Sequence, residues 1–137
     1  MFPRVDKGTI EYRLTIQQAL NKEKNRHCIR FTFQTTEEFT YFRYGITIDH
    51  ELKKKEIHFY LRGLKTLGLT VPESGAAQSS LDLFDLGGEY KVTIQKQGAS
   101  RNDFSLKISP AALKLLRDVH DKTPFIELDV STNSNHA

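Results

Sequence analysis

The fold is decided between residues 27 and 62, where three apolar-patterned runs follow one another: HCIRFTFQ (27–34), FTYFRYGITI (39–48) and EIHFYLR (56–62). In the first run Ile29, Phe31 and Phe33 alternate with polar residues, and the third run alternates in the same way. A period of two is typical of a strand with one buried face. The polar connections are short enough to be turns, so we expect the three runs to form one antiparallel meander.

The middle run changes its alternation. Its apolar residues occupy even positions from 42 to 48, whereas Phe39 and Tyr41 occupy odd ones. A strand covered on both faces would show this pattern, and so would a β-bulge, which shifts the alternation by one residue. Glycine tolerates the backbone angles of a bulge, and we therefore favour a bulge near Gly45.

Further strands are predicted on both sides of this stretch. Residues 9–16 alternate cleanly, whereas 17–26 offer few apolar positions and are expected to form a loop. After the small, polar segment 72–80, which we interpret as a mobile loop, a short strand is expected at 81–86. The turn signal Gly87-Gly88 then leads into a hairpin, residues 89–108, and a last strand is expected at 126–130.

One segment changes the period from two to that of a helix. Ser109 suits the cap of a helix, Pro110 suits its first turn, and apolar residues then recur at helical spacing from Ala112 to Val119. Thr123 and Pro124 would end the segment. The sequence therefore predicts one amphipathic helix over about residues 110–121.

These elements together predict a mainly β protein. We expect an antiparallel β-sandwich or partly open barrel of about seven to nine strands, with the C-terminal helix of residues 110–121 before the last strand. The chain has 137 residues, the usual size of one domain. Residues 1–130 are therefore expected to form a single β-rich domain, and the polar residues 131–137 a disordered tail.

Composition limits the function classes without choosing one. The net charge of +3 is mildly basic, well below that of a dedicated nucleic-acid binder. The lone Cys28 lies inside an apolar run and is interpreted as a small buried hydrophobe, which fits a reducing compartment. No apolar run approaches the roughly 18 residues of a membrane span, so we expect a soluble, cytoplasmic protein with no membrane partner.

The familiar catalytic and nucleotide-binding motifs are missing from the sequence. It contains no Gly-x-Ser-x-Gly, no Walker-type Gly-Lys-Ser/Thr and no Gly-x-Gly-x-x-Gly. The acidic and histidine residues between Asp49 and His58 match no known metal-ligand spacing, and three lysines lie among them. We therefore assign no catalytic residue, no metal site and no cofactor, and we favour a protein that is not an enzyme.

The candidate binding surface combines cationic and aromatic residues on the outward faces of the predicted strands. Neighbouring strands of one sheet would set these side chains about 5 Å apart, in a shallow basic patch on which rings could stack. An ordinary solvated β face would carry the same residue types. The candidate residues are Arg30, Arg43, Lys53, Lys54, Lys55, His58, Tyr60 and Arg62.

Three functional hypotheses follow from the sequence. The leading one is a non-catalytic β-sandwich module that binds a protein partner, or itself, through a sheet face or edge. The second is a single-stranded nucleic-acid-binding protein that uses the basic aromatic face. The third is a small-ligand-binding protein or enzyme with a pocket gated by the loop of residues 72–80.

Overall fold

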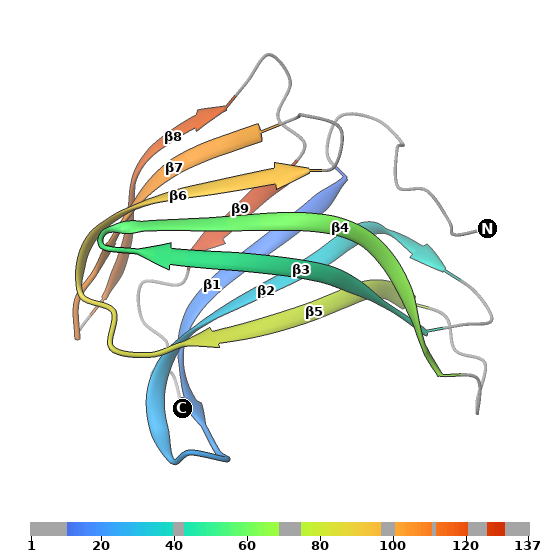
Figure 1. Cartoon of the computed structure of the whole chain (residues 1–137), viewed down its shortest axis with the longest axis horizontal. Helices are drawn as coiled ribbons and strands as arrows, with labels where there is room; N and C mark the ends of the chain where they lie inside the picture. The colour runs from blue at the N-terminus through green and yellow to red at the C-terminus, as the bar shows by residue number, and fades with distance from the viewer. Residues whose placement is uncertain are drawn as a thin grey trace.

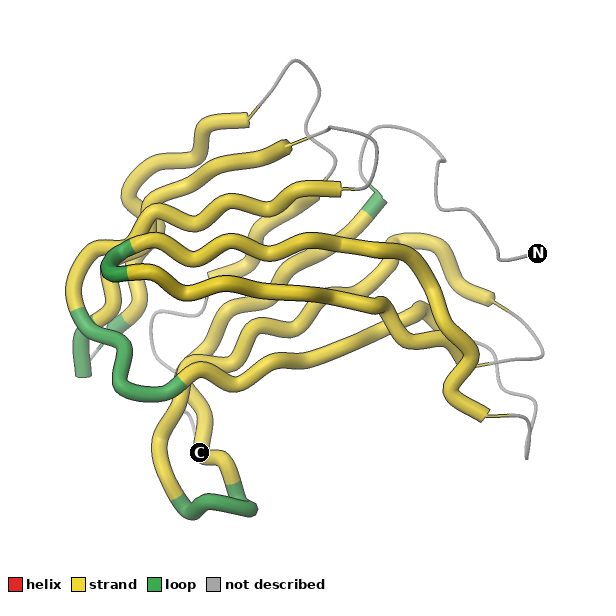
Figure 2. Tube along the Cα trace, in the orientation of Figure 1, coloured by secondary structure: helices red, strands yellow, loops and turns green. Residues whose placement is uncertain are grey.

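The computed structural model describes residues 11–39, 43–68, 75–96, 101–110, 112–120 and 126–130. These residues form nine strands and no helix. Figure 2 shows the strands in yellow and the described loops in green. The prediction of a mainly β protein is therefore confirmed. The strands are β1 (Tyr12–Asn21), β2 (Arg26–Phe39), β3 (Arg43–Lys53), β4 (Glu56–Gly68), β5 (Gly75–Leu83), β6 (Gly88–Lys96), β7 (Arg101–Ile108), β8 (Leu113–His120) and β9 (Ile126–Val130).

The strands are arranged in two sheets that form a sandwich-like structure (Figure 1). Sheet A has the order β5-β2-β1-β9, and sheet B has the order β3-β4-β6-β7-β8. Both sheets are mixed rather than purely antiparallel, because β1 pairs in parallel with β9 and β4 pairs in parallel with β6. Parallel pairing needs a long crossover, and here the chain visits the other sheet between the two strands of each pair.

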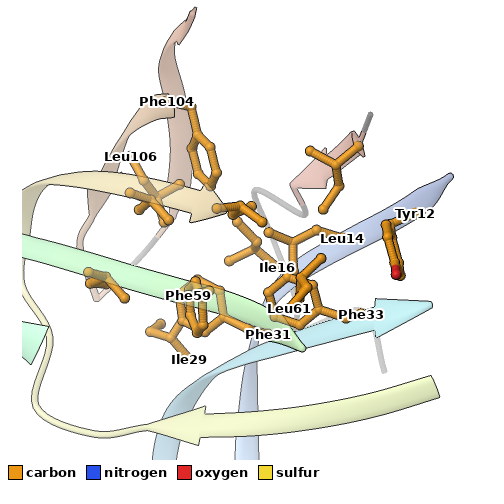
Figure 3. Close-up of a cluster of buried hydrophobic side chains, with 14 of the residues drawn as sticks. Tyr12, Leu14, Ile16, Ile29, Phe31, Phe33, Phe59, Leu61, Phe104 and Leu106 are labelled. Atoms are coloured by element: carbon orange, nitrogen blue, oxygen red, sulfur yellow. The ribbon is translucent and has the colours of Figure 1, made fainter. Parts of the chain in front are cut away.

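A hydrophobic core fills the space between the two sheets (Figure 3). Phe59 of β4 is fully buried, and its ring centroid lies 5.1 Å from that of Phe31 and 5.1 Å from that of Phe33, both on β2. The sandwich is also tied along one side, where the Ser79 hydroxyl of β5 accepts a hydrogen bond from the Ile46 amide (2.8 Å) and donates one to the Ile46 carbonyl (2.7 Å). The sheets are therefore joined both by aromatic packing and by hydrogen bonds from a side chain of one sheet to the backbone of the other.

The predicted meander is wrong in one respect. The second and third of its runs pair as β3 and β4, but the first run is β2, which lies in the other sheet. Strand β2 extends to Phe39 and pairs with β1 on one edge and with β5 on the other. Because both edges of β2 are occupied, β3 cannot join it and starts the opposite sheet.

The predicted helix of residues 110–121 is also wrong, because Leu113–His120 form strand β8 at the edge of sheet B. Ser109 and Ala112 exchange two backbone hydrogen bonds, which close a hairpin between β7 and β8. The Ser109 hydroxyl accepts a hydrogen bond from the Ala112 amide at 3.2 Å, the same bond that a helix cap would make. Ser followed by Pro suits a tight turn as well as a helix start. Here the residues after the turn pair with the edge of β7, so they form a strand instead of a helix.

The predicted loop of residues 17–26 is mostly strand, since β1 continues to Asn21 and a short turn leads into β2 at Arg26. Strand β9 pairs with β1 only as far as Ile16, and β5 pairs with β2 only from Ile29 onward. The hairpin between these limits projects from the sandwich, as the blue ribbon shows in Figure 1. Because this ribbon largely lacks a core to cover, its sequence shows no alternation of apolar residues.

Two further predictions are wrong, the mobile loop at residues 72–80 and the bulge near Gly45. Residues 75–80 of the predicted mobile loop belong to β5, and residues 72–74 lie outside the described residues. The pairing is irregular on both sides of Gly45, but the extra residues lie in β4. Thr47 pairs with Gly63 and Ile48 with Leu61, so the bulge is at Arg62 and Gly63, where Gly63 has a φ of 135°.

Candidate binding face

Strand β4 carries a stack of three planar side chains on the face of sheet B that points away from the core. Because residues 57, 59 and 61 are buried, His58, Tyr60 and Arg62 point outward. The rings of His58 and Tyr60 are nearly parallel, with centroids 4.2 Å apart and an interplanar angle of 10°. The guanidinium carbon of Arg62 lies 5.1 Å from the centroid of the Tyr60 ring. We call this arrangement the β4 stack.

Neighbouring strands fix each member of the β4 stack by one polar contact. The hairpin register sets Asp49 opposite Tyr60 and Glu51 opposite His58, and the parallel pairing sets β6 on the other side. The contacts are Tyr60 Oη donating to Glu51 Oε1 (3.2 Å), Arg62 Nε donating to Asp49 Oδ2 (2.8 Å) and His58 Nε2 with Gln95 Oε1 (3.2 Å). Desolvation and the hydrogen bond to Glu51 raise the pKa of Tyr60, so its hydroxyl remains a hydrogen-bond donor.

The geometry of the β4 stack limits what it can bind. His58 and Arg62 flank Tyr60 along the strand, so both faces of the Tyr60 ring are covered. A nucleobase or a sugar ring could stack on Tyr60 only if the β4 stack opened. The polar atoms of Tyr60 and Arg62 are instead turned to the carboxylates of Glu51 and Asp49, and the Arg62 side chain is exposed to solvent.

A second polar feature lies on the same face, two strands from β4. Thr93 of β6 pairs with His58 on one side and with Asp103 of β7 on the other. Asp103 Oδ1 is buried and has no hydrogen-bond partner among the described residues, while Oδ2 lies 3.5 Å from Arg101 Nε. A buried acceptor without a donor is costly, and because this oxygen is covered by the protein itself it is a local cost of the sheet rather than a group offered at the surface.

The predicted lysines occupy the turn between β3 and β4 and differ in their surroundings. Lys53 lies 3.7 Å from Glu51, and Lys54 has a φ of 51° in the turn. The Lys55 ammonium donates to the Gly87 carbonyl at 2.5 Å and lies 4.8 Å from the centre of the Tyr90 ring. Lys55 therefore braces the connection before β6, whereas the other two lysines point into solvent.

Arg30 is not brought together with the β4 stack. It lies on the outer face of sheet A, and the two outer faces of a sandwich point in opposite directions. Its guanidinium binds both carboxylate oxygens of Asp82, at 2.8 and 3.0 Å, and Asn21 donates to the same carboxylate at 2.9 Å. Burial raises the pKa of the adjacent Cys28 thiol, as expected for an unreactive cysteine. The side chain of Arg43, on β3, lies outside the described residues.

Sequence reasoning found the three members of the β4 stack but missed the side chains that hold them. Asp49 and Glu51 would have followed from a hairpin whose tight turn is at Lys54 and Lys55, because that register fixes every cross-strand pair. Gln95 depends on the parallel pairing of β4 with β6, which alternation alone does not encode.

Comparisons with known proteins add no relative. No protein-family model, no curated protein and no solved structure matches this chain. Within the described ranges, no helix is long and apolar enough to cross a membrane. In the same ranges, no three His, Cys, Asp or Glu side chains gather closely enough to hold a metal ion.

Proposed function

We propose that this chain is a non-catalytic binding module that engages a protein partner through the outer face of sheet B. The observation that carries the proposal is the β4 stack, three planar side chains held in register on an open face. Tyr and Arg are enriched among residues that dominate protein–protein binding energy. A side chain already fixed by its neighbours loses less conformational entropy on binding.

The polar character of this face also supports a protein partner. Asp49, Glu51 and Arg62 are exposed and bound to their neighbours, so the face offers fixed donors and acceptors rather than unbalanced charge. Electrostatic catalysis depends on preorganised groups in a site from which water is excluded, whereas these groups lie on a solvated surface, which favours binding over catalysis.

The nucleic-acid hypothesis receives less support from the same contacts. Binding of phosphate would have to compete with Asp49 for Arg62 and with Asp82 for Arg30. Stacking of bases would have to displace His58 or Arg62 from Tyr60. Both steps cost free energy, which counts against the nucleic-acid hypothesis.

Site-specific photo-crosslinking tests the proposal. A photoreactive amino acid at Lys91, which is exposed on the outer face of sheet B, should crosslink one defined protein in an extract of the source organism. Excess unlabelled protein should compete with that crosslink, whereas excess Tyr60→Ala/Arg62→Ala protein should not. The control places the same amino acid at Gln78, which is exposed on the outer face of sheet A. Equal crosslinking from both positions, or equal competition by the variant, would refute the proposal.

A further inference from the structure

Four chain connections gather at one end of the sandwich and contact one another. The turn between β3 and β4 reaches the connection before β6 through Lys55 and Gly87. That connection reaches the projecting β1–β2 hairpin through Asp85, whose carboxylate oxygens both lie 2.9 Å from Arg26 Nη2. Gln18 of β1 donates to the Ser109 carbonyl at 2.8 Å, which joins the turn between β7 and β8 to the same group. We call these connections the basic end.

The net positive charge of the protein is concentrated in the basic end. Residues 20–27, 52–56, 84–89 and 107–114 hold eight Lys or Arg residues and four carboxylates, a net charge of +4, whereas the entire chain has a net charge of +3. The cationic residues are all exposed. They are Lys22, Lys24, Arg26, Lys53, Lys54, Lys55, Lys107 and Lys114.

Two leucines are exposed among these charges. Leu20 is 45% exposed next to the turn between β1 and β2, and Leu52 is 44% exposed next to the turn between β3 and β4. Each lies within two residues of a lysine in its turn. Exposed leucines on two separate hairpins, surrounded by cations, match the combination by which proteins dock on anionic membrane surfaces.

We propose that the basic end docks the protein on the surface of an anionic lipid bilayer, with Leu20 and Leu52 entering the headgroup region. This differs from the expectation of no membrane partner, which rested on the absence of a membrane span, and surface docking needs none. One aromatic ring at this end, that of Phe84, has the Lys24 ammonium 5.2 Å and the Arg26 guanidinium carbon 4.8 Å from its centroid. A lipid surface uses the leucines and lysines together, whereas a nucleic acid would use only the cations.

Vesicle co-sedimentation tests the docking. The probes are phosphatidylcholine vesicles with and without about one third phosphatidylserine, at about 50 and 200 mM salt. The protein should sediment with the anionic vesicles, more weakly at the higher salt, and should stay in solution with pure phosphatidylcholine. The triple variant Lys22→Gln/Lys53→Gln/Lys54→Asn should bind about a hundredfold more weakly, because each lysine near the surface contributes about a fivefold factor. Leu20→Asn/Leu52→Asn should bind about tenfold more weakly.

A matched control removes two charges at the opposite ends of the strands, and it is compared with Lys22→Gln/Lys54→Asn, which should lose about 25-fold in vesicle binding. Arg13→Gln/Arg101→Gln changes the net charge by the same amount as that pair, and its vesicle binding should fall less than about threefold. Absence of binding to anionic vesicles at low salt, or an equal loss in the control, would overturn the proposal. Unchanged vesicle binding by the leucine variant, together with lysine-dependent binding of labelled single-stranded DNA, would assign the basic end to nucleic acid instead. Each result is independent of the β4 stack, because Tyr60 and Arg62 are intact in every variant.

Discussion

Arg30 on β2 and Asp82 on β5 are direct cross-strand partners and form a two-pronged ion pair, with Nε–Oδ1 at 2.8 Å and Nη2–Oδ2 at 3.0 Å. The Asp82 side chain is only 14% exposed, and Asn21 donates to it from the adjacent hairpin. The pair therefore lies in partly buried surroundings, where a two-pronged contact contributes more than an exposed ion pair would. It connects the edge strand β5 to the centre of sheet A.

The first prediction concerns the acid stability that Asp82 provides. The hydrogen bonds from Arg30 lower the pKa of Asp82 from 3.8 to about 2. A lowered pKa in the folded state stabilises the fold above pH 3.8, and this contribution is lost as the pH falls toward 2. Asp82→Asn should therefore lower the free energy of unfolding by about 1 to 2 kcal/mol at pH 7. Urea unfolding from pH 7 to pH 2 should show the difference shrinking below pH 4, and a constant difference would contradict this account.

The second prediction concerns the aromatic contact between the sheets. Phe59→Ala should lower the free energy of unfolding by about 3 to 5 kcal/mol, because it leaves a cavity next to Phe31 and Phe33. Tyr60→Ala, one residue further along the same strand, should lower it by less than about 1 kcal/mol because that side chain points outward. Denaturant unfolding measures both variants, and similar losses would place the core elsewhere.

The third prediction concerns the bulge in β4. Gly63 has a φ of 135°, and a Cβ atom added there would meet nothing within 4 Å. Gly63→Ala should therefore destabilise the protein through backbone strain rather than a clash, by about 1 to 3 kcal/mol. Gly87 is equally open, and no strained φ is associated with it. Thermal unfolding of Gly87→Ala should stay within about 0.5 kcal/mol of the original protein, and the two variants behaving alike would argue against the bulge.

The fourth prediction separates strand β8 from the helix that the sequence favoured. In the strand, Leu113 is fully buried and Leu116 is 40% exposed at a register shift opposite Ser105 and Leu106. In a helix over residues 110–121, Leu116 would lie on the apolar face with Leu115. Leu113→Lys should therefore cost at least about 3 kcal/mol of unfolding free energy, while Leu116→Lys should be nearly neutral. A larger loss for Leu116→Lys than for Leu113→Lys would contradict the strand and support the helix.

Most of the strands could be predicted because a half-covered strand leaves a period of two in the sequence. In β6, in β7 and in β4 as far as Leu61, the apolar residues that face the core are those that the alternation indicates, and β6 and β7 form the expected hairpin. Beyond the bulge of β4 the alternation shifts, and Leu64 is the buried residue. The prediction of a helix was wrong because Ser109 and Pro110, which suit the start of a helix, also suit a turn between two strands. The sequence predicts the bulge near Gly45 of β3, because that glycine lies where the alternation changes. The bulge lies instead in the partner strand β4, at Gly63.

The candidate site was only half predictable, because alternation assigns a side chain to a face but not to a sheet. His58, Tyr60 and Arg62 share one strand, so their common face followed from the sequence alone. Arg30 was grouped with them because β2 precedes β3 in the chain, yet the two strands lie in different sheets. Strand order depends on which edges are already occupied, and that is a property of the whole fold rather than of any one run.

The most direct test of the proposed function is the affinity of the partner captured from the outer face of sheet B. Isothermal titration calorimetry should show Tyr60→Ala/Arg62→Ala binding that partner at least about thirtyfold more weakly than the original protein, as expected when two central interface residues are lost. Arg30→Met, on the opposite outer face, should bind it with unchanged affinity. If Arg30→Met weakens binding and the Tyr60/Arg62 variant does not, the partner binds sheet A and the β4 stack is only a solvated surface.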